Sequence, residues 1–152
     1  MRLLVGTLDG YKLDSKGRLS IPTKWRERLG KEFYMVSVTV RGCKCLNLYP
    51  EGYFNEMYDS MQHGTENQKY DAITSFLDNA EEAVLDAQGR FTVNQRLKDA
   101  AGLSNETTVV FKGKGRFIEI WNSEEYEKIS GTYDHNEGIY DLMDKLKGGS
   151  AE

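Results

Sequence analysis

A five-residue pattern, Asp-x-x-Gly-Arg, occurs at residues 14–18 and again at residues 86–90. Its aspartate can accept hydrogen bonds from backbone N–H groups, and its glycine can adopt a positive φ, so the pattern is typical of a tight polar turn. Its arginine can bind a phosphate, or the O6/N7 edge of guanine, through two parallel hydrogen bonds. The pattern therefore predicts two turns that offer guanidinium groups to a nucleic acid. The residues expected to build these turns are Asp14, Gly17, Asp86 and Gly89.

Four side chains of the two turns are candidate DNA contacts, namely Lys16, Arg18, Gln88 and Arg90. Lys16 is a flexible point charge, which favours a phosphate contact over base recognition. Gln88 stands at the equivalent position, where it could pair with adenine or remain solvated. For each arginine an ion pair with the aspartate of its own turn is an equally good interpretation. Both roles are compatible if the aspartate orients the loop.

The two turns belong to an internal repeat whose offset is the separation of Asp14 from Asp86. The match continues beyond the turns at the same offset, since Leu29 and Gly30 correspond to Ala101 and Gly102. Further along, Leu46, Leu48 and Tyr49 correspond to Ile118, Ile120 and Trp121. A register shared from the turns to these strand residues indicates two copies of one small module.

Each copy predicts the same series of elements. Leu19 and Ile21 alternate with polar residues after the first turn, so we expect a β-hairpin with the turn at its tip. A short helix should follow, with Trp25 and Leu29 on one face in the first copy and Leu97 above Ala101 in the second. The expected strands that close the copies are residues 33–41 and 46–49, and residues 107–112 and 117–121.

Charge alternates along the chain in blocks. Residues 1–49 hold ten Lys or Arg against four Asp or Glu, a net +6, and residues 83–121 hold six against four, a net +2. The segments 50–82 and 122–152 carry −7 and −5, and the whole chain carries −4. Basic segments thus coincide with the repeats, so one face can attract phosphate although the protein is acidic.

The acidic segments predict helices. Tyr53, Met57 and Met61 are four residues apart, and residues 65–68 resemble a capping box that opens a second helix. Residues 139–146 hold another apolar stripe at helical spacing, followed by a tail from Gly148 that we expect to be disordered. We interpret these stripes as core or subunit contacts.

Several classes of function find no support in the residues. Cys43 and Cys45 favour free thiols, because alternate strand residues suit neither a disulfide nor a complete metal site. Residues 113–116 lack the spacing of a phosphate-binding loop and predict a hairpin turn. No arrangement of nucleophile and base is present, so we expect no enzyme activity, no cofactor, no metal and no small-molecule substrate. No run of apolar residues is long enough for a membrane span.

The paired turns, the GRLSIP continuation of the first copy, its LNLYP end and the IEIW end of the second copy resemble the MraZ family, within the AbrB-like group of bacterial DNA-binding proteins. The resemblance covers about residues 1–130. It implies an α+β fold of two tandem AbrB-like swapped-hairpin β-barrel units with short helices, related by a pseudo-twofold axis at the linker helices and forming a homo-oligomeric ring. Asn94 departs from the proline that is usual there.

The domain boundaries that follow are residues 1–55 for the first AbrB-like repeat, 56–82 for a helical linker, 83–130 for the second repeat and 131–152 for a C-terminal helix and tail. The resemblance implies a cytoplasmic, nucleoid-associated regulator of transcription that binds double-stranded DNA. Its expected targets are its own promoter and a gene cluster for cell division and cell-wall synthesis, where it would bind spaced repeats. The alternative is a protein-binding module of the same fold, antitoxin-like or scaffold-like.

Overall fold

The computed structural model describes residues 2–132 and 135–151 and has a mixed α+β architecture. Within these residues a six-stranded sheet has the order β1-β7-β8-β4-β3-β5, and a separate two-stranded ribbon consists of β2 and β6. All pairings are antiparallel. The strands are β1 (Thr7–Lys12), β2 (Arg18–Ser20), β3 (Glu32–Val40), β4 (Cys43–Pro50), β5 (Ala80–Val84), β6 (Arg90–Thr92), β7 (Thr108–Gly113) and β8 (Ile118–Asn122).

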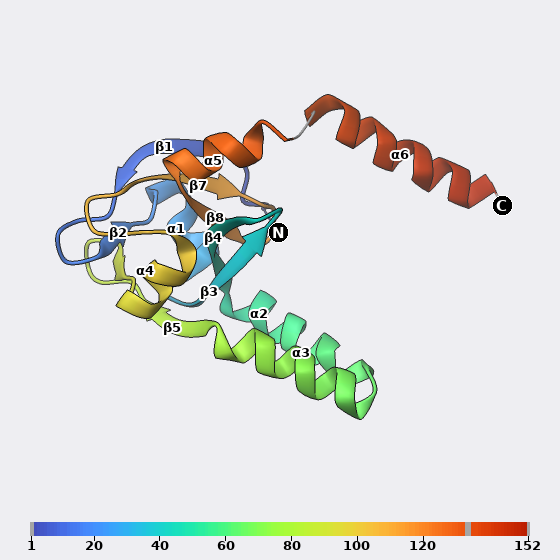
Figure 1. The fold of residues 1–152 in the computed structure, drawn as a ribbon, viewed down its shortest axis with the longest axis horizontal. Helices are drawn as coiled ribbons and strands as arrows, with labels where there is room; N and C mark the ends of the chain where they lie inside the picture. Colours follow the sequence, from blue (N-terminus) through green and yellow to red (C-terminus); the bar gives the residue numbers. More distant parts are fainter. Residues whose placement is uncertain (1, 133–134, 152) are drawn as a thin grey trace.

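The helices lie on the outside of this framework (Figure 1). They are α1 (Thr23–Leu29), α2 (Glu51–Ser60), the short 3₁₀ helix η1 (Met61–His63), α3 (Glu66–Asp78), α4 (Gln95–Ala101), α5 (Ser123–Ser130) and α6 (His135–Ala151). The mixed α+β class agrees with the prediction. The strands that close each repeat begin and end within three residues of their predicted limits.

The predicted hairpin within each repeat is wrong. β1 does not pair with β2 across the first turn; it pairs with β7, while β2 pairs with β6 of the other repeat. In this ribbon Leu19 lies opposite Phe91, and both side chains are almost completely buried. The exchange gives the two repeats one shared core, whereas a repeat of half this length would bury too little apolar surface by itself.

Strand register locates the pseudo-twofold axis. Leu19 and Phe91 are equivalent residues of the two repeats and lie opposite each other, and Asn47 and Glu119 do the same in the β4–β8 pair. Only a twofold axis through both pairs places equivalent residues opposite one another. The prediction that the linker helices mark this axis is therefore wrong, because the axis passes through the β2–β6 and β4–β8 pairs.

The two short helices that follow the turns begin differently. α1 follows Pro22, which makes no side-chain cap, whereas Asn94 caps α4 by accepting a hydrogen bond from the Leu97 N–H group at 2.9 Å. Each helix faces the core as predicted, with Trp25 and Leu29 1% exposed and Leu97 fully buried. Asn94 thus replaces the usual proline with a different device for the same helix start.

The linker forms a helical hairpin. Thr65 and Gln68 make both hydrogen bonds of the predicted capping box at the start of α3. Phe76 of α3 then stacks on Phe54 of α2 with ring centroids 4.5 Å apart. This contact attaches the hairpin to the sheet, because Phe54 also stacks on Tyr34 of β3.

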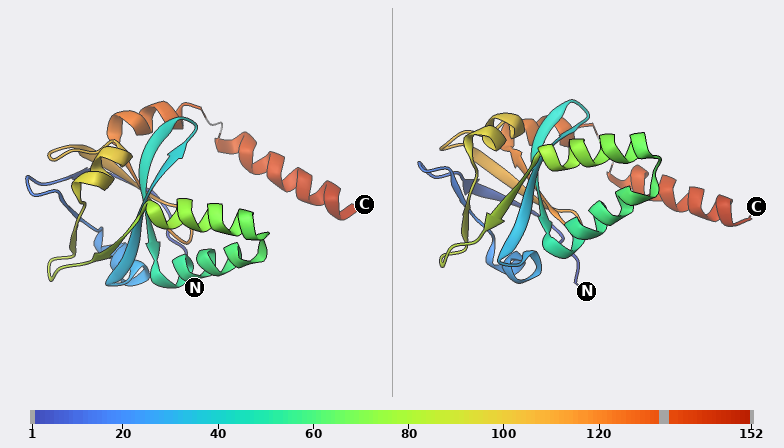
Figure 2. Two further views of the ribbon diagram at one scale, coloured as in Figure 1. Left: turned by 60° about the horizontal axis from the view of Figure 1, so that its bottom comes forward. Right: turned by 90° about the horizontal axis from the view of Figure 1, so that it is seen from below.

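The C-terminal helices are counterparts of that linker. The start of α5 is related to the start of α2 by the repeat offset, and α6 covers the segment equivalent to α3. However, α6 extends away from the body (Figures 1 and 2). It continues to Ala151, where the sequence predicts a disordered tail from Gly148; once a helix is nucleated, each added residue gains a hydrogen bond. Within the described ranges, no helix has the length and apolarity to cross a membrane.

The shared core predicts a single unfolding transition. Phe91→Ala should destabilise the protein by about 3–5 kcal/mol, because Phe91 fills the core between the two repeats. Urea denaturation followed by tryptophan fluorescence would measure this, with Trp25→Phe and Trp121→Phe variants reporting the second and the first repeat separately. The two midpoints should coincide and shift together. Tyr70→Ala on the exposed face of α3 is the control and should change stability by less than about 0.5 kcal/mol. Separate transitions for the two tryptophans would contradict a common core.

Candidate nucleic-acid interface

The first turn is organised by the Asp14 carboxylate. Its Oδ1 atom accepts hydrogen bonds from the backbone N–H groups of Lys16 and Arg18, both at 2.9 Å. Its Oδ2 atom accepts a third from the Arg18 Nε atom at 2.7 Å. Gly17 closes the turn with a φ of +75°, a region where side chains are strained. Asp14 and Gly17 therefore build the turn, as their residue types predict.

The second turn repeats these contacts. Asp86 accepts hydrogen bonds from the N–H groups of Gln88 and Arg90 at 2.9 Å, and from the Arg90 Nε atom also at 2.9 Å. Gly89 has a φ of +76°. The ion pair that competed with the DNA-contact interpretation is thus present in both turns. It holds each arginine in one orientation relative to the backbone.

These bonds keep both aspartates ionised. The backbone hydrogen bond from Arg18 is the largest influence on Asp14 and, with its side-chain bond and that from Lys16, lowers the pKa of the Asp14 carboxyl from 3.8 to about 2. The same contacts from Arg90 and Gln88 lower the pKa of Asp86. At neutral pH the ionised aspartate therefore holds each arginine at its Nε atom. It leaves the Nη atoms of that arginine free of the aspartate.

The pairing uses only one edge of each guanidinium. Within residues 2–132 and 135–151, neither Nη atom of Arg18 has a hydrogen-bond partner, and its side chain is 28% exposed. The Arg90 Nη2 atom donates to the Gln88 side chain at 3.3 Å, and that arginine is 31% exposed. Each arginine therefore still presents N–H donors to a ligand after its aspartate is satisfied.

The ribbon brings the two arginines together from opposite halves of the chain. In β2 and β6 the buried residues Leu19 and Phe91 face inward, so Arg18 and Arg90 on either side face outward. They are diagonal neighbours across the ribbon, because Arg18 lies opposite Thr92. Both turns project from the same end of the molecule, away from α3 and α6 (Figure 2). The arginines predicted as a pair from the repeat thus share one surface.

Each turn is also supported by the helix of the other repeat. A Cβ atom on Gly89 would overlap the guanidinium of Arg26 in α1, and one on Gly17 would lie 3.1 Å from the Lys98 ammonium in α4. The Ile21 N–H group donates to the Gly89 carbonyl at 2.9 Å. Arg26 and Lys98 are themselves equivalent positions of the two repeats. The repeat offset relates Arg26 to Lys98, but neither residue was predicted from the sequence to contact DNA or to support a turn.

The two supporting cations have different surroundings. Lys98 is 7% exposed and donates to the Asn105 side chain at 2.7 Å, and Asn105 in turn donates to the Ser15 carbonyl. It is therefore a buried link between α4 and the first turn. Arg26 donates through Nε to the Ile21 carbonyl and lines an open groove beside the second turn, together with Lys31. The second turn thus gains surface cations from the first repeat.

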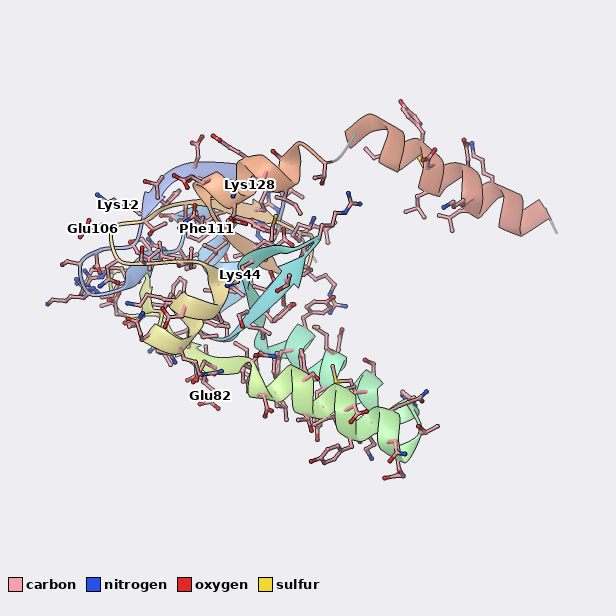
Figure 3. All side chains as sticks on the ribbon, in the orientation of Figure 1. Lys12, Lys44, Glu82, Glu106, Phe111 and Lys128 are labelled. Carbon is pink, nitrogen blue, oxygen red and sulfur yellow. The ribbon has the colours of Figure 1, made fainter. Side chains whose placement is uncertain are left out.

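The other predicted residues make fewer contacts with the turns. Lys16 and Gln88 are exposed at the turns, and the Gln88 side chain accepts a hydrogen bond from Arg90 at 3.3 Å. Lys12 forms an ion pair with Glu106 at 3.2 Å (Figure 3), which offsets its charge. Cys43 and Cys45 are free thiols, and the part of the chain that the structure describes contains no group of three or more potential metal ligands. Tyr49 and Trp121 are buried and pack in the body of the protein.

The contact between Gly89 and Arg26 predicts a measurable cost. Gly89→Ala should destabilise the protein by more than the roughly 1–2 kcal/mol of a left-handed alanine, because the methyl group must also displace the Arg26 guanidinium. Gly42→Ala is the matched control, since Gly42 has a φ of +79° with no atom within 4 Å of the added carbon. Urea denaturation measures both, and Arg26→Ala should remove the difference. Equal losses in the two glycine variants would show that the contact has no energetic weight.

The aspartate geometry predicts a pH dependence. Because folding lowers the pKa of Asp14 from 3.8 to about 2, its contribution to stability is complete above about pH 4 and is lost as the pH falls towards 2. Asp14→Asn should reduce the slope of stability against pH in that window and leave the slope above pH 5 unchanged. Urea midpoints at a series of pH values provide the measurement. An unchanged acid slope in the variant would argue against the Asp14 hydrogen bonds.

Comparisons with a family model and with known proteins all point to one family. The family model described as "MraZ protein, putative antitoxin-like" matches twice, at residues 4–75 and 76–139. A Transcriptional regulator MraZ from Finegoldia magna is 32% identical over 138 residues, covering 90% of this chain and 92% of the relative. The protein of that name from Corynebacterium jeikeium is 35% identical, with 89% and 91% coverage, and that from Micrococcus luteus is 36% identical, with 76% and 78% coverage.

These relatives carry the name of a regulator and not that of an enzyme, in agreement with the prediction of no enzyme activity. The two family matches divide the chain near residue 75, so each contains one Asp-x-x-Gly-Arg turn and the elements that follow it. With this repeat and this coverage of relatives above 30% identity, the chain belongs to the MraZ family.

Proposed function

We propose that the protein is a sequence-specific DNA-binding regulator of transcription that contacts DNA through its two Asp-x-x-Gly-Arg turns. One observation carries the proposal: Arg18 and Arg90 come from equivalent positions of two repeats, face outward from one ribbon and retain unpaired donors. A two-stranded ribbon fits the major groove, where paired N–H donors recognise guanine. The names of the relatives, Transcriptional regulator MraZ, support the same function.

The aspartates prepare the arginines for this contact. A free arginine side chain loses much rotational freedom on binding, whereas Arg18 is already held at Nε by Asp14 at 2.7 Å. Arg18 and Arg90 then act as base or phosphate ligands, with Lys16 on phosphate and Gln88 beside a base. The first turn carries a net positive charge through Lys16, and the second gains positive charge from Arg26 of the other repeat. Both turns therefore attract DNA.

The regulator acts as a homo-oligomeric ring of AbrB-like swapped-hairpin subunits. Exposed apolar side chains of α6 support assembly, since Ile139, Leu142 and Leu146 are 59–65% exposed. A ring presents many turns at once, so weak contacts add up on DNA with spaced repeats. The proposed targets are its own promoter and a cell-division and cell-wall gene cluster, which place the protein on the nucleoid in the cytoplasm.

A protein-binding module, antitoxin-like or scaffold-like, is the second candidate. The exposed apolar face of α6 favours it, because a helix of this kind can lie in a hydrophobic groove of a partner. The description of the family as antitoxin-like points the same way. This function leaves the turns without a role, whereas DNA binding uses them.

Removing the guanidinium groups should reduce DNA affinity. Arg18→Ala, in every subunit of the oligomer, should weaken binding by more than the roughly 1–3 kcal/mol of one bidentate contact, and Arg90→Ala should weaken it as well. Arg18→Lys keeps the positive charge but loses the paired N–H donors of the guanidinium. This variant should therefore bind DNA with little preference for the native sequence. Fluorescence anisotropy on DNA from upstream of the gene, against a scrambled duplex and across a salt series, measures these effects.

Lys128→Ala is the charge-matched control, because Lys128 is exposed on α5 away from the turns (Figure 3). It should bind as the wild type does. Tight, salt-dependent binding that prefers the native sequence and is lost in Arg18→Ala would support the proposal. Binding that is unchanged in the arginine variants would remove the turns from the interface. Absence of binding at low salt would favour the protein-binding module, for which a mass measurement and a pull-down would be the next steps.

A further inference from the structure

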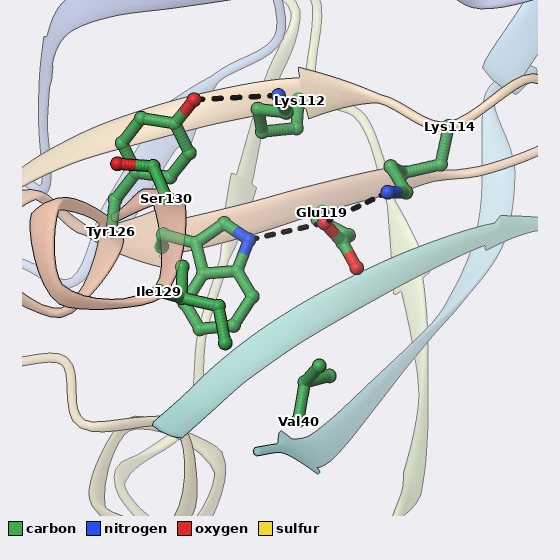
Figure 4. A pocket seen from close by; sticks show the side chains of 8 residues that line it. Val40, Lys112, Lys114, Glu119, Tyr126, Ile129 and Ser130 are labelled. Carbon is green, nitrogen blue, oxygen red and sulfur yellow. Dashed lines mark hydrogen bonds and ion pairs between the residues drawn. The ribbon is translucent and has the colours of Figure 1, made fainter. Parts of the chain in front are cut away.

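A cavity of about 200 Å³ lies between α5, β7, β8 and the end of β3 (Figure 4). Its apolar wall contains Trp121 and Ile129, which are 2% and 4% exposed, and Val40. Its polar side contains Lys112, Lys114, Glu119, Tyr126 and Ser130. The cavity lies apart from the β2–β6 ribbon and its turns, so the proposed DNA contacts do not account for its residues.

The charges around this cavity are unequal. Glu119 is 8% exposed; it accepts a hydrogen bond from the Trp121 Nε1 atom at 3.1 Å and has the Lys114 ammonium at 4.0 Å. Lys112 donates instead to the Tyr126 hydroxyl at 3.3 Å. Within the described residues, no carboxylate lies within ion-pair distance of Lys112. One cation at the cavity is therefore in excess, and it lies beside a hydroxyl that can also bind an anion.

In the first repeat, the place equivalent to this cavity has a purely structural role. Lys112 pairs with Glu119 as Val36 pairs with Asn47. Lys112 and Lys114 therefore correspond to Val36 and Val38, and Tyr126 corresponds to Phe54. Phe54 has an aromatic ring stacked on each side, from Tyr34 at 3.9 Å and from Phe76 at 4.5 Å. Its environment is thus a closed aromatic cluster.

The second repeat lacks this stacked aromatic cluster. The residue equivalent to Phe76 is Gly148, and the helix that would carry it, α6, extends away from the body. Tyr126 packs against the cluster of Cys45, Trp121 and Ile129, and among the described residues it has no stacked ring like those on Phe54; the Lys112 ammonium lies 5.3 Å from its ring centroid. Two copies of one fold have therefore diverged at this place, one towards apolar filling and the other towards an open cavity with lysines and hydroxyls.

We propose that this cavity binds a small organic acid with a single aromatic or similarly flat apolar body. The Lys112 ammonium and the Tyr126 hydroxyl hold the carboxylate, and the apolar body lies against Trp121 and Ile129. A volume of about 200 Å³ is below the roughly 300–1,000 Å³ of sites for drug-sized molecules, which limits the ligand to about one ring. The ligand is bound and not converted, and the site does not depend on the proposed DNA contacts.

Benzoate is a suitable probe, with benzamide as its neutral analogue of the same shape. The full-length oligomer, labelled with 5-fluorotryptophan, should give two ¹⁹F resonances, which Trp25→Phe assigns. Benzoate should shift the Trp121 resonance saturably and leave that of Trp25 unchanged. Lys112→Met should weaken benzoate binding by at least about tenfold, and Lys44→Met, a lysine exposed on β4, is the matched control that should have no effect.

Saturable binding of benzoate but not of benzamide, lost in Lys112→Met and kept in Lys44→Met, would establish the site. No saturable shift of Trp121 would overturn it, including the case in which another subunit covers the cavity in the oligomer. Equal binding of benzoate and benzamide, or benzoate binding that survives Lys112→Met, would also overturn it, because the lysine would then have no role. Since the readout is a tryptophan resonance, failure here leaves the DNA-binding proposal untouched.

Discussion

Leu19 and Phe91 lie opposite each other in the β2–β6 ribbon, and the rest of the structure depends on this contact. Each contributes a buried side chain to a core that both repeats share. The pairing exchanges strands between the repeats, so that the residues on either side, Arg18 and Arg90, are brought to one outer surface. Without the exchange, each arginine would stand on a separate small unit with too little core to hold it in place.

The repeat and the chemistry of the turns could be predicted from the sequence, and their joining could not. Asp14 and Arg18 are four residues apart, so the residue types alone allowed their ion pair as one of two interpretations, and the structure contains it. β1 and β7 are far apart in the chain, and alternating apolar residues such as Leu19 and Ile21 fit a local hairpin as well as an exchanged one. The choice between them is decided by the burial of the common core, which no local pattern records.

The same limit explains the residues that were missed from the sequence. Arg26 and Lys98 stand at equivalent positions, yet each supports the turn of the other repeat, so their role follows only from the exchange. The sequence also did not reveal that α5 and α6 are the counterparts of α2 and α3, for a different reason. Both helix pairs keep the repeat offset, but their side chains have diverged, as the change from Phe76 to Gly148 shows. The positions of the helices along the chain were retained there, whereas the packing of the second helix on the body was not.

Both turns face DNA together if the exchanged ribbon is the interface. Site-specific photocrosslinking tests this most directly, with benzoylphenylalanine placed at position 16, at position 88 and, as a control, at position 70 on the exposed face of α3. All three positions are exposed, so the probe disturbs no packing. The exchanged ribbon predicts crosslinks to the duplex from positions 16 and 88 and none from position 70. Crosslinks from only one turn, or from position 70 instead, would contradict a shared interface built by the exchanged strands.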